Sequence, residues 1–170
     1  GFMITLHHLN KSRSKRIIWL LEELGVEYRI IPYLRDANTF LAPATLKEIH
    51  PLGKSPVIED NGLVITESGA IIEYLIDRYA PKDLAPARGT DDYVSYLQWL
   101  HFAESSAMLP LLLKMFLAKD GCETKFLKHY ADNEATKIID YIEQSLDGKK
   151  YFVANKLTGA DIIMSFVVEI

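Results

Sequence analysis

The sequence predicts an α/β region followed by an all-helical region. The first 80 residues mix short segments of period-two hydrophobicity with helical segments, whereas beyond residue 91 the apolar residues recur at helical spacing. A stretch with two prolines and a glycine, "APKDLAPARGT" at 80–90, separates the two patterns. We therefore expect one domain over 1–80, a linker over 81–90 and a helical domain over 91–170.

The first 31 residues predict a strand, a helix and a second strand. Ile4 and Leu6 alternate with polar neighbours, as is typical of a strand. Gly25 is placed to end a helix, and the strand pattern resumes at Val26. The helix itself is predicted by apolar residues at spacings of three and four, namely Ile17, Leu20, Leu21 and Leu24. This order favours a right-handed βαβ unit.

Residues 35–80 predict an irregular helix, a hairpin and a further helix. Residues 35–50 show no strong period, so we expect a loop with a short, irregular helix. The turn Asp-Asn-Gly at 60–62 joins two β-branched runs, which is a hairpin signal. Ser68 can then cap a helix that ends before Pro81.

Three helices are predicted after residue 91. A long helix over 93–119 should be kinked by Pro110, because proline removes a backbone N–H and clashes with the preceding turn. A second helix is expected over 126–146. Thr158 and Asp161 resemble a capping box at the start of a third, with aspartate in place of glutamate.

Composition excludes several classes of function. The net charge is −4 with acids and bases interspersed, so we expect no nucleic-acid partner. Cys122 is the only cysteine, which excludes an intramolecular disulfide and favours a reducing compartment. No apolar run approaches the roughly 20 residues of a membrane span and no signal peptide is evident, so we expect a cytoplasmic protein without a transmembrane segment.

A proline stands directly before the first strand of the predicted hairpin. A cis bond between Ser55 and Pro56 would turn the backbone of Ser55 outward, where it could pair with an extended peptide. The alternative is a proline that only starts an edge strand. This stretch alone does not separate the two.

Glu67 and Ser68 stand at the start of the next predicted helix. A serine hydroxyl and the free N-terminal amides of a helix can bind a carboxylate, which the helix dipole also favours. Glu67 can pair with an ammonium group, so the two residues suit the α-amino-acid end of a ligand. The alternative is an ordinary N-cap beside a solvated glutamate.

Ser12 and Ser14 lie in the turn before the first helix. A hydroxyl that donates to a bound thiolate contributes about 1.5–3 kcal/mol, and the helix dipole up to about 1 kcal/mol. Together they would lower the pKa of a thiol from about 8.5 to about 6–7, so that it is largely ionised at neutral pH. The alternative for either serine is an N-cap.

Four segments occur in order along the chain: "HHLNKSRSKRIIWLLEELGVEYRIIPYLRDANTF", "IHPLGKSPVI", "ITESGAIIEYL" and "KLTGADIIMSF". They resemble the cytosolic glutathione S-transferase family, in particular a fungal and bacterial subgroup with a serine-type N-terminal motif. This resemblance covers essentially the whole chain. It implies a thioredoxin-like N-terminal domain that binds glutathione, a helical C-terminal domain and a homodimer. Glutathione would be a co-substrate, and no tightly bound cofactor or metal is implied.

The resemblance also assigns binding roles. Pro56 matches the family's cis-proline, and Ser55 matches the residue whose backbone pairs with the cysteinyl part of glutathione. Glu67 and Ser68 match the pair that holds the γ-glutamyl end. Lys54 could neutralise the glycyl carboxylate, or be an ordinary solvated lysine.

The residue that activates the thiol stays open. Ser12 matches the activating hydroxyl of the serine-type classes when the family's motif is aligned with this sequence at Arg16. Ser14 is the alternative. His8 ends the first strand where many relatives have tyrosine, so we do not expect tyrosine-type activation. His8 could contact the site, or face solvent or core. No cysteine lies near Ser12, which argues against the related thiol-transfer classes.

The resemblance implies conjugation of the glutathione thiolate to small electrophilic apolar compounds. A non-catalytic glutathione-binding or interaction module and a glutathione-dependent peroxidase are the alternatives. The chain ends at Ile170, where relatives continue through further helices, so we expect an incomplete helical domain. The acceptor is expected against the long helix, at residues that could equally be core: His101, Ser105, Met108 and Leu112.

Overall fold

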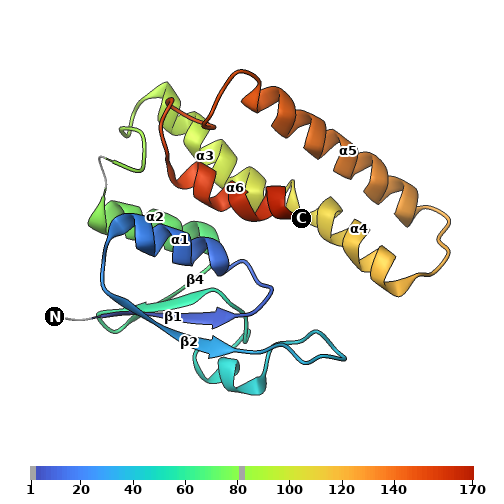
Figure 1. The fold of residues 1–170 in the computed structure, drawn as a ribbon, viewed down its shortest axis with the longest axis horizontal. Coiled ribbons are helices and arrows are strands. Elements are labelled where there is room, and N and C mark those ends of the chain that lie inside the picture. Colours follow the sequence, from blue (N-terminus) through green and yellow to red (C-terminus); the bar gives the residue numbers. More distant parts are fainter. Residues whose placement is uncertain (1–2, 81–82) are drawn as a thin grey trace. The chain divides into compact units, whose positions relative to one another are not determined.

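The computed structural model describes residues 3–80 and 83–170. The chain divides into two compact units, Gly1–Pro81 and Lys82–Ile170 (Figure 1). Positions 81–82 of the expected linker lie outside the described residues. Positions 83–90 form turns and bends without a helix or strand.

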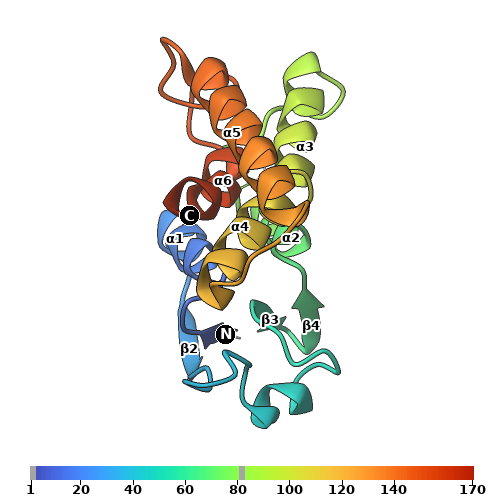
Figure 2. The ribbon, with the colours of Figure 1, turned by 90° about the vertical axis from the view of Figure 1, so that its right-hand side faces the viewer.

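The N-terminal unit is a four-stranded mixed sheet with both of its α-helices on one face. The strand order is β2-β1-β3-β4. β1 pairs with β2 in parallel, and the pairs β1–β3 and β3–β4 are antiparallel. Figure 2 shows α1 and α2 side by side on the same face of this sheet. The elements are β1 (Ile4–Leu9), α1 (Lys15–Leu24), β2 (Tyr28–Tyr33), the 3-10 helix η1 (Ala44–Glu48), β3 (Val57–Asp60), β4 (Leu63–Thr66) and α2 (Ser68–Tyr79).

This element order confirms the predicted βαβ, irregular helix, ββα arrangement, which is the thioredoxin-like fold. The helix-stop signal is also confirmed, because Gly25 follows α1 in the left-handed conformation with φ of 66°. Asn61 and Gly62 join β3 to β4, and both have positive φ, as the two central residues of a type I′ hairpin turn require. The core lies between sheet and helices and includes Leu6, Leu20, Leu21, Ile58 and Ile72.

The C-terminal unit is all-helical. α3 (Asp91–Glu104) packs against α6 (Gly159–Glu169), and α4 (Met108–Asp120) packs against α5 (Leu127–Leu146) (Figure 1). The predicted capping box begins α6. The Thr158 hydroxyl accepts from the Ala160 N–H at 3.2 Å, and the Asp161 carboxylate accepts from the Thr158 N–H at 3.0 Å. Apolar residues of α6 form the centre of this unit, since Ile162, Ile163 and Met164 are fully buried.

The prediction of one long helix kinked at Pro110 is wrong. Two helices are present, and residues 105–107 separate them. Pro110 is the third residue of α4, within the first helical turn, where backbone N–H groups have no partner inside the helix. The proline is therefore tolerated near a helix start instead of bending a helix interior.

One apolar stretch bears on the expectation that the chain has no transmembrane segment. Among the described residues, the stretch Asp91–Asp120 is long and apolar enough to cross a membrane when it is counted as a single helix. The core helices of globular proteins meet the same criterion. The break between α3 and α4 divides this stretch into segments of 14 and 13 residues, each shorter than the roughly 20 residues that a span needs.

Candidate glutathione site

The predicted site residues of the N-terminal unit gather at one edge of its sheet. His7 on β1 pairs with Val57 on β3, and Val57 pairs with Thr66 on β4. The end of β1, the start of β3 and the end of β4 therefore lie at the same edge. α1 follows β1 and α2 follows β4, so both helices begin there as well.

Ser55 and Pro56 lie at this edge, and the peptide bond between them is cis, as predicted. The Ser55 hydroxyl donates to the His7 carbonyl at 2.7 Å and accepts from the Leu9 N–H at 3.2 Å. These two bonds fix the loop against the end of β1. In the described parts of the chain, no hydrogen bond uses the backbone N–H or C=O of Ser55, so these groups can pair with a ligand.

The structure differs from the prediction in the residue that caps α2. Glu67, not Ser68, is the N-cap of α2, and its side chain makes no capping bond. Ser68 is the first helical residue and is buried. Glu67 has φ of 69° and ψ of 121°, which is strained for a residue with a side chain. Strained backbone of this kind clusters at functional sites.

Arg13 adds a cation that sequence reasoning did not select. Burial lowers the pKa of Arg13, and the negative charge of Glu67 partly offsets this by raising it. Since such an effect requires proximity, the turn before α1 and the start of α2 lie close together. The signal in the sequence was the basic run 11–16, which is typical of a solvated helix start.

Ser12 has a structural role in the turn before α1. Its side chain is 6% exposed. The hydroxyl donates to the Leu9 carbonyl at 2.6 Å and accepts from the Ser14 N–H at 3.2 Å. A hydroxyl has a single proton, so Ser12 can donate to a thiolate only by leaving the Leu9 carbonyl.

The two adjacent histidines of β1 have different environments. His7 is buried between strands, where Nδ1 is 2.9 Å from the Tyr33 hydroxyl and Nε2 is 2.8 Å from the Glu59 carboxylate. His8 is partly exposed, and its Nδ1 forms a hydrogen bond with the Ser14 hydroxyl. Ser14 is fully buried. Burial also lowers the pKa of His8, which favours the neutral imidazole.

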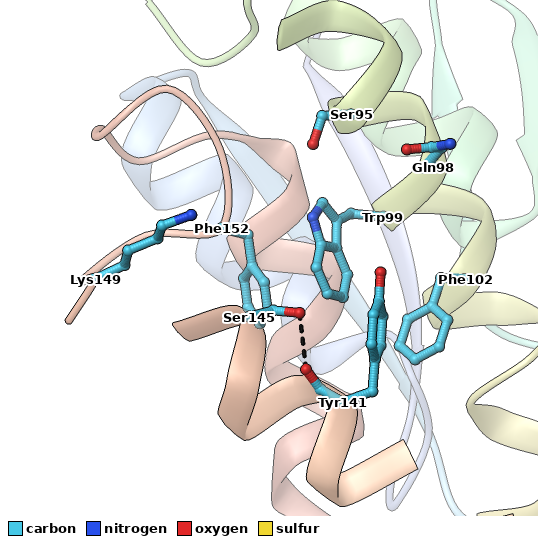
Figure 3. Close-up of a pocket in the computed structure, with 8 residues that line it drawn as sticks. All are labelled: Ser95, Gln98, Trp99, Phe102, Tyr141, Ser145, Lys149 and Phe152. Atoms are coloured by element: carbon cyan, nitrogen blue, oxygen red, sulfur yellow. Dashed lines mark hydrogen bonds between the residues drawn. The ribbon is translucent and has the colours of Figure 1, made fainter. Parts of the chain in front are cut away.

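The predicted acceptor residues lie in the C-terminal unit and do not form one surface. His101 and Ser105 are exposed, Leu112 is partly exposed, and Met108 is buried in the core. None of the four lines the cavity drawn in Figure 3, which has a volume of about 420 Å³. Its lining includes Trp99 and Tyr141, whose rings are stacked with their centroids 5.3 Å apart. The assignment of the acceptor residues stays a prediction.

Lys54, next to Ser55, is exposed, so its side chain is available to solvent or to a ligand. Over residues 3–80 and 83–170, no group of three or more His, Cys, Asp or Glu side chains could hold a metal ion.

Comparison with known proteins identifies the family. The N-terminal domain of glutathione S-transferases matches residues 3–77, and the C-terminal domain matches residues 103–170. Glutathione S-transferase 3 of Schizosaccharomyces pombe is 34% identical over 98% of this chain and 73% of its own length. Glutathione S-transferase 1 of Saccharomyces cerevisiae is also 34% identical, over 98% and 80%. The chain belongs to the glutathione S-transferase family.

Solved structures agree with this fold. A glutathione S-transferase from Actinobacillus pleuropneumoniae has 40% sequence identity and a TM-score of 0.88, over 98% of this chain and 77% of its own. A glutathione transferase homologue from Lodderomyces elongisporus, solved with two GSH per subunit, has 22% identity and a TM-score of 0.83. It covers 98% of this chain and 83% of its own. The second comparison supports the fold alone.

Proposed function

We propose that the chain binds glutathione at the sheet edge where β1 and β4 end, and transfers its thiolate to small electrophilic apolar compounds. The observation that supports this most is the backbone of Ser55, whose N–H and C=O have no hydrogen-bond partner in the described chain. An extended peptide can pair with these groups as an added strand would.

Charged and polar side chains near the backbone of Ser55 can bind the two ends of the tripeptide. The γ-glutamyl ammonium pairs with Glu67, and its carboxylate binds Ser68 at the N-terminus of α2, where the helix dipole favours an anion. Arg13 adds positive charge near Glu67, and Lys54 neutralises the glycyl carboxylate. The cysteinyl residue pairs with Ser55, so its sulfur lies near the end of β1 and the start of α1.

The reaction balances without a metal or a redox cofactor. The bound thiol releases its proton to solvent and keeps the bonding pair as thiolate. The sulfur then forms a bond to an electrophilic carbon, and the leaving group departs with its electron pair. Ser12 is the first hydroxyl candidate for lowering the thiol pKa, provided that it rotates away from the Leu9 carbonyl, and Ser14 is the second.

The test combines binding and turnover. We expect the protein to be retained on immobilised glutathione and to conjugate a generic aryl halide. Ser68→Ala should weaken glutathione binding about tenfold or more, as expected for a charge-assisted hydrogen bond. Thr136→Ala, at an exposed position on α5, is the matched control and should change nothing.

Other outcomes would point to other functions. Retention without conjugation would favour a non-catalytic glutathione-binding module, and glutathione-dependent reduction of an organic hydroperoxide would favour a peroxidase. Absence of retention would contradict the proposal. The proposed setting is the cytoplasm, and the proposed assembly is a homodimer.

A further inference from the structure

We propose that His8, held in one tautomer by Ser14, donates its Nε2–H to the sulfur of bound glutathione and stabilises the thiolate. This inference rests on the proposed function, because it names the group that acts on the thiol in the same site.

The hydrogen bond with Ser14 determines the tautomer of His8. The Ser14 hydroxyl is fully buried, and its one side-chain partner in the described chain is His8 Nδ1. Ser14 is the N-cap of α1, yet its side chain makes no capping bond. A buried hydroxyl needs an acceptor for its proton, and Nδ1 is the acceptor within reach. A neutral imidazole that accepts at Nδ1 carries its own proton on Nε2.

The Nε2–H of His8 is available to a ligand. In the parts of the chain that the structure describes, no hydrogen bond uses this nitrogen, and the side chain is partly exposed. His7 differs, because both of its ring nitrogens bond to protein groups. Of the two neighbouring histidines, His8 therefore has the donor that can meet a substrate.

The position of His8 suits the sulfur of a bound cysteinyl residue. His8 lies between His7 and Leu9, and both of these neighbours bond through their backbones to the hydroxyl of Ser55. The cysteinyl residue of a ligand that pairs with the backbone of Ser55 therefore lies beside the end of β1. Side chains alternate along a strand, so His8 shares a face with the core residue Leu6 and points toward the start of α1, where Ser14 lies.

The charge state of His8 fits a donor and not a base. Burial lowers its pKa, so the ring is neutral at pH 7, and its one N–H is on the side away from Ser14. The proton of the thiol leaves to solvent, and the electron pair stays on sulfur, where the Nε2–H stabilises it. Ser12 is a weaker candidate because its proton is already given to the Leu9 carbonyl.

The experiment compares His8→Asn with His8→Gln in the full chain. Asparagine can accept from the Ser14 hydroxyl in place of Nδ1 but has no donor at the position of Nε2. Glutamine places an amide N–H near that position. The readout is the pH dependence of thiolate ultraviolet absorption of bound glutathione, with the glutathione Kd measured by calorimetry and folding by circular dichroism.

We expect His8→Asn to raise the pKa of the bound thiol by about 1–2 pH units, which lowers the thiolate fraction at pH 7 by about 2–50-fold when the wild-type pKa is about 6–7. Below about pH 6, where glutathione binds mainly as the thiol, the Kd should change less than about threefold, because the interaction favours the thiolate more than the thiol. Near neutral pH the Kd should rise together with the loss of thiolate. His8→Gln should recover part of the loss. Ser14→Ala should give a smaller increase, because His8 then keeps its donor but loses its fixed tautomer. His129→Asn, an exposed histidine on α5, is the control and should have no effect.

The outcomes that overturn the inference are separate from those that overturn the proposed function. An unchanged thiol pKa in His8→Asn, with intact glutathione binding, excludes His8 as the donor. An increase in Ser12→Ala but not in His8→Asn gives the role to Ser12. A larger increase in Ser14→Ala than in His8→Asn means that Ser14 contacts the sulfur directly. Failure of the folded wild-type protein to bind glutathione contradicts the proposed function itself.

Discussion

Glu67 has a backbone conformation that is costly for any residue with a side chain. Its φ of 69° with ψ of 121° lies outside the regions that L-residues commonly occupy. Such strain costs about 1–3 kcal/mol and persists where the surrounding structure enforces it. Because the proposed function uses Glu67 to bind an ammonium group, stability and binding should oppose each other at this residue.

Two substitutions at Glu67 separate these effects. Both Glu67→Gly and Glu67→Ala remove the carboxylate, so we expect both to weaken glutathione binding to a similar degree. Glycine also relieves the backbone strain, at a cost of about 0.5–1 kcal/mol in chain entropy. The glycine variant should therefore be more stable than the alanine variant by about 1–2 kcal/mol. Urea unfolding and calorimetry measure the two quantities, and equal stability of the variants would show that the position is unstrained.

We expect the hydroxyl of Ser12 to stabilise the folded protein. Its buried hydroxyl bonds to both the Leu9 carbonyl and the Ser14 N–H, and Ser12→Ala leaves these two groups without their partner. We expect a loss of about 1–3 kcal/mol in the free energy of unfolding. Chemical denaturation measures it, with Thr136→Ala as an exposed control that should stay within about 0.5 kcal/mol of wild type. A loss no greater than that of the control would mean that the turn satisfies these groups in another way.

At the scale of elements, one buried carboxylate connects β3 to α2. Asp60, at the end of β3, is 2% exposed and accepts hydrogen bonds from the hydroxyls of Tyr74 and Tyr79, each at 2.8 Å. Both tyrosines belong to α2. Burial, together with these bonds to Asp60, raises the pKa of Tyr79 to about 12 and also raises that of Tyr74. The folded protein thus holds the protonated phenols.

This connection predicts a loss of stability at alkaline pH. The folded-state pKa of Tyr79 is about 12, above the ordinary value of 10.0, so its contribution is complete below pH 10 and is lost as pH rises toward 12. Tyr79→Phe should make the fall in unfolding free energy shallower across this window. Denaturation at several pH values, with phenolate absorbance as a second probe, measures the effect. Tyr130→Phe, at an exposed position on α5, is the control, and equal slopes in both variants would contradict the prediction.

The helices and strands could be predicted where local signals decide them. The left-handed Gly25, the Asn-Gly turn and the capping box at Thr158 each act through backbone conformation or a bond to a near neighbour. The break at 105–107 could not be predicted in this way, because apolar spacing continues across it. Pro110 drew attention as the strongest helix breaker, yet proline breaks a helix only beyond its first turn.

At the scale of the whole molecule, topology explains why the site could be predicted in outline. A βαβ unit followed by a hairpin and a helix brings the end of β1, the start of β3 and the end of β4 to one edge. The sequence therefore indicated which segments meet. It could not indicate which acceptor each hydroxyl bonds to, and this choice separates Ser12, bonded to Leu9, from Ser14, bonded to His8.

In the same topology β4 is an outer strand of the sheet, and it has exposed apolar side chains. Leu63 and Val64 are 51% and 42% exposed. An apolar edge strand is a surface that proteins usually cover, and a second copy of the chain would cover it in the proposed homodimer. We expect sedimentation equilibrium to give twice the chain mass of 19.3 kDa.

A charge on this strand should weaken the dimer. Val64→Asp would place a carboxylate in the contact without a partner, so the dimer dissociation constant should rise about tenfold or more, which corresponds to about 1.4 kcal/mol. Leu41→Asp is the control, because Leu41 is 66% exposed but lies in the loop after β2. A monomeric wild-type protein would contradict the homodimer, whereas a dimer that resists Val64→Asp would place the contact on another surface.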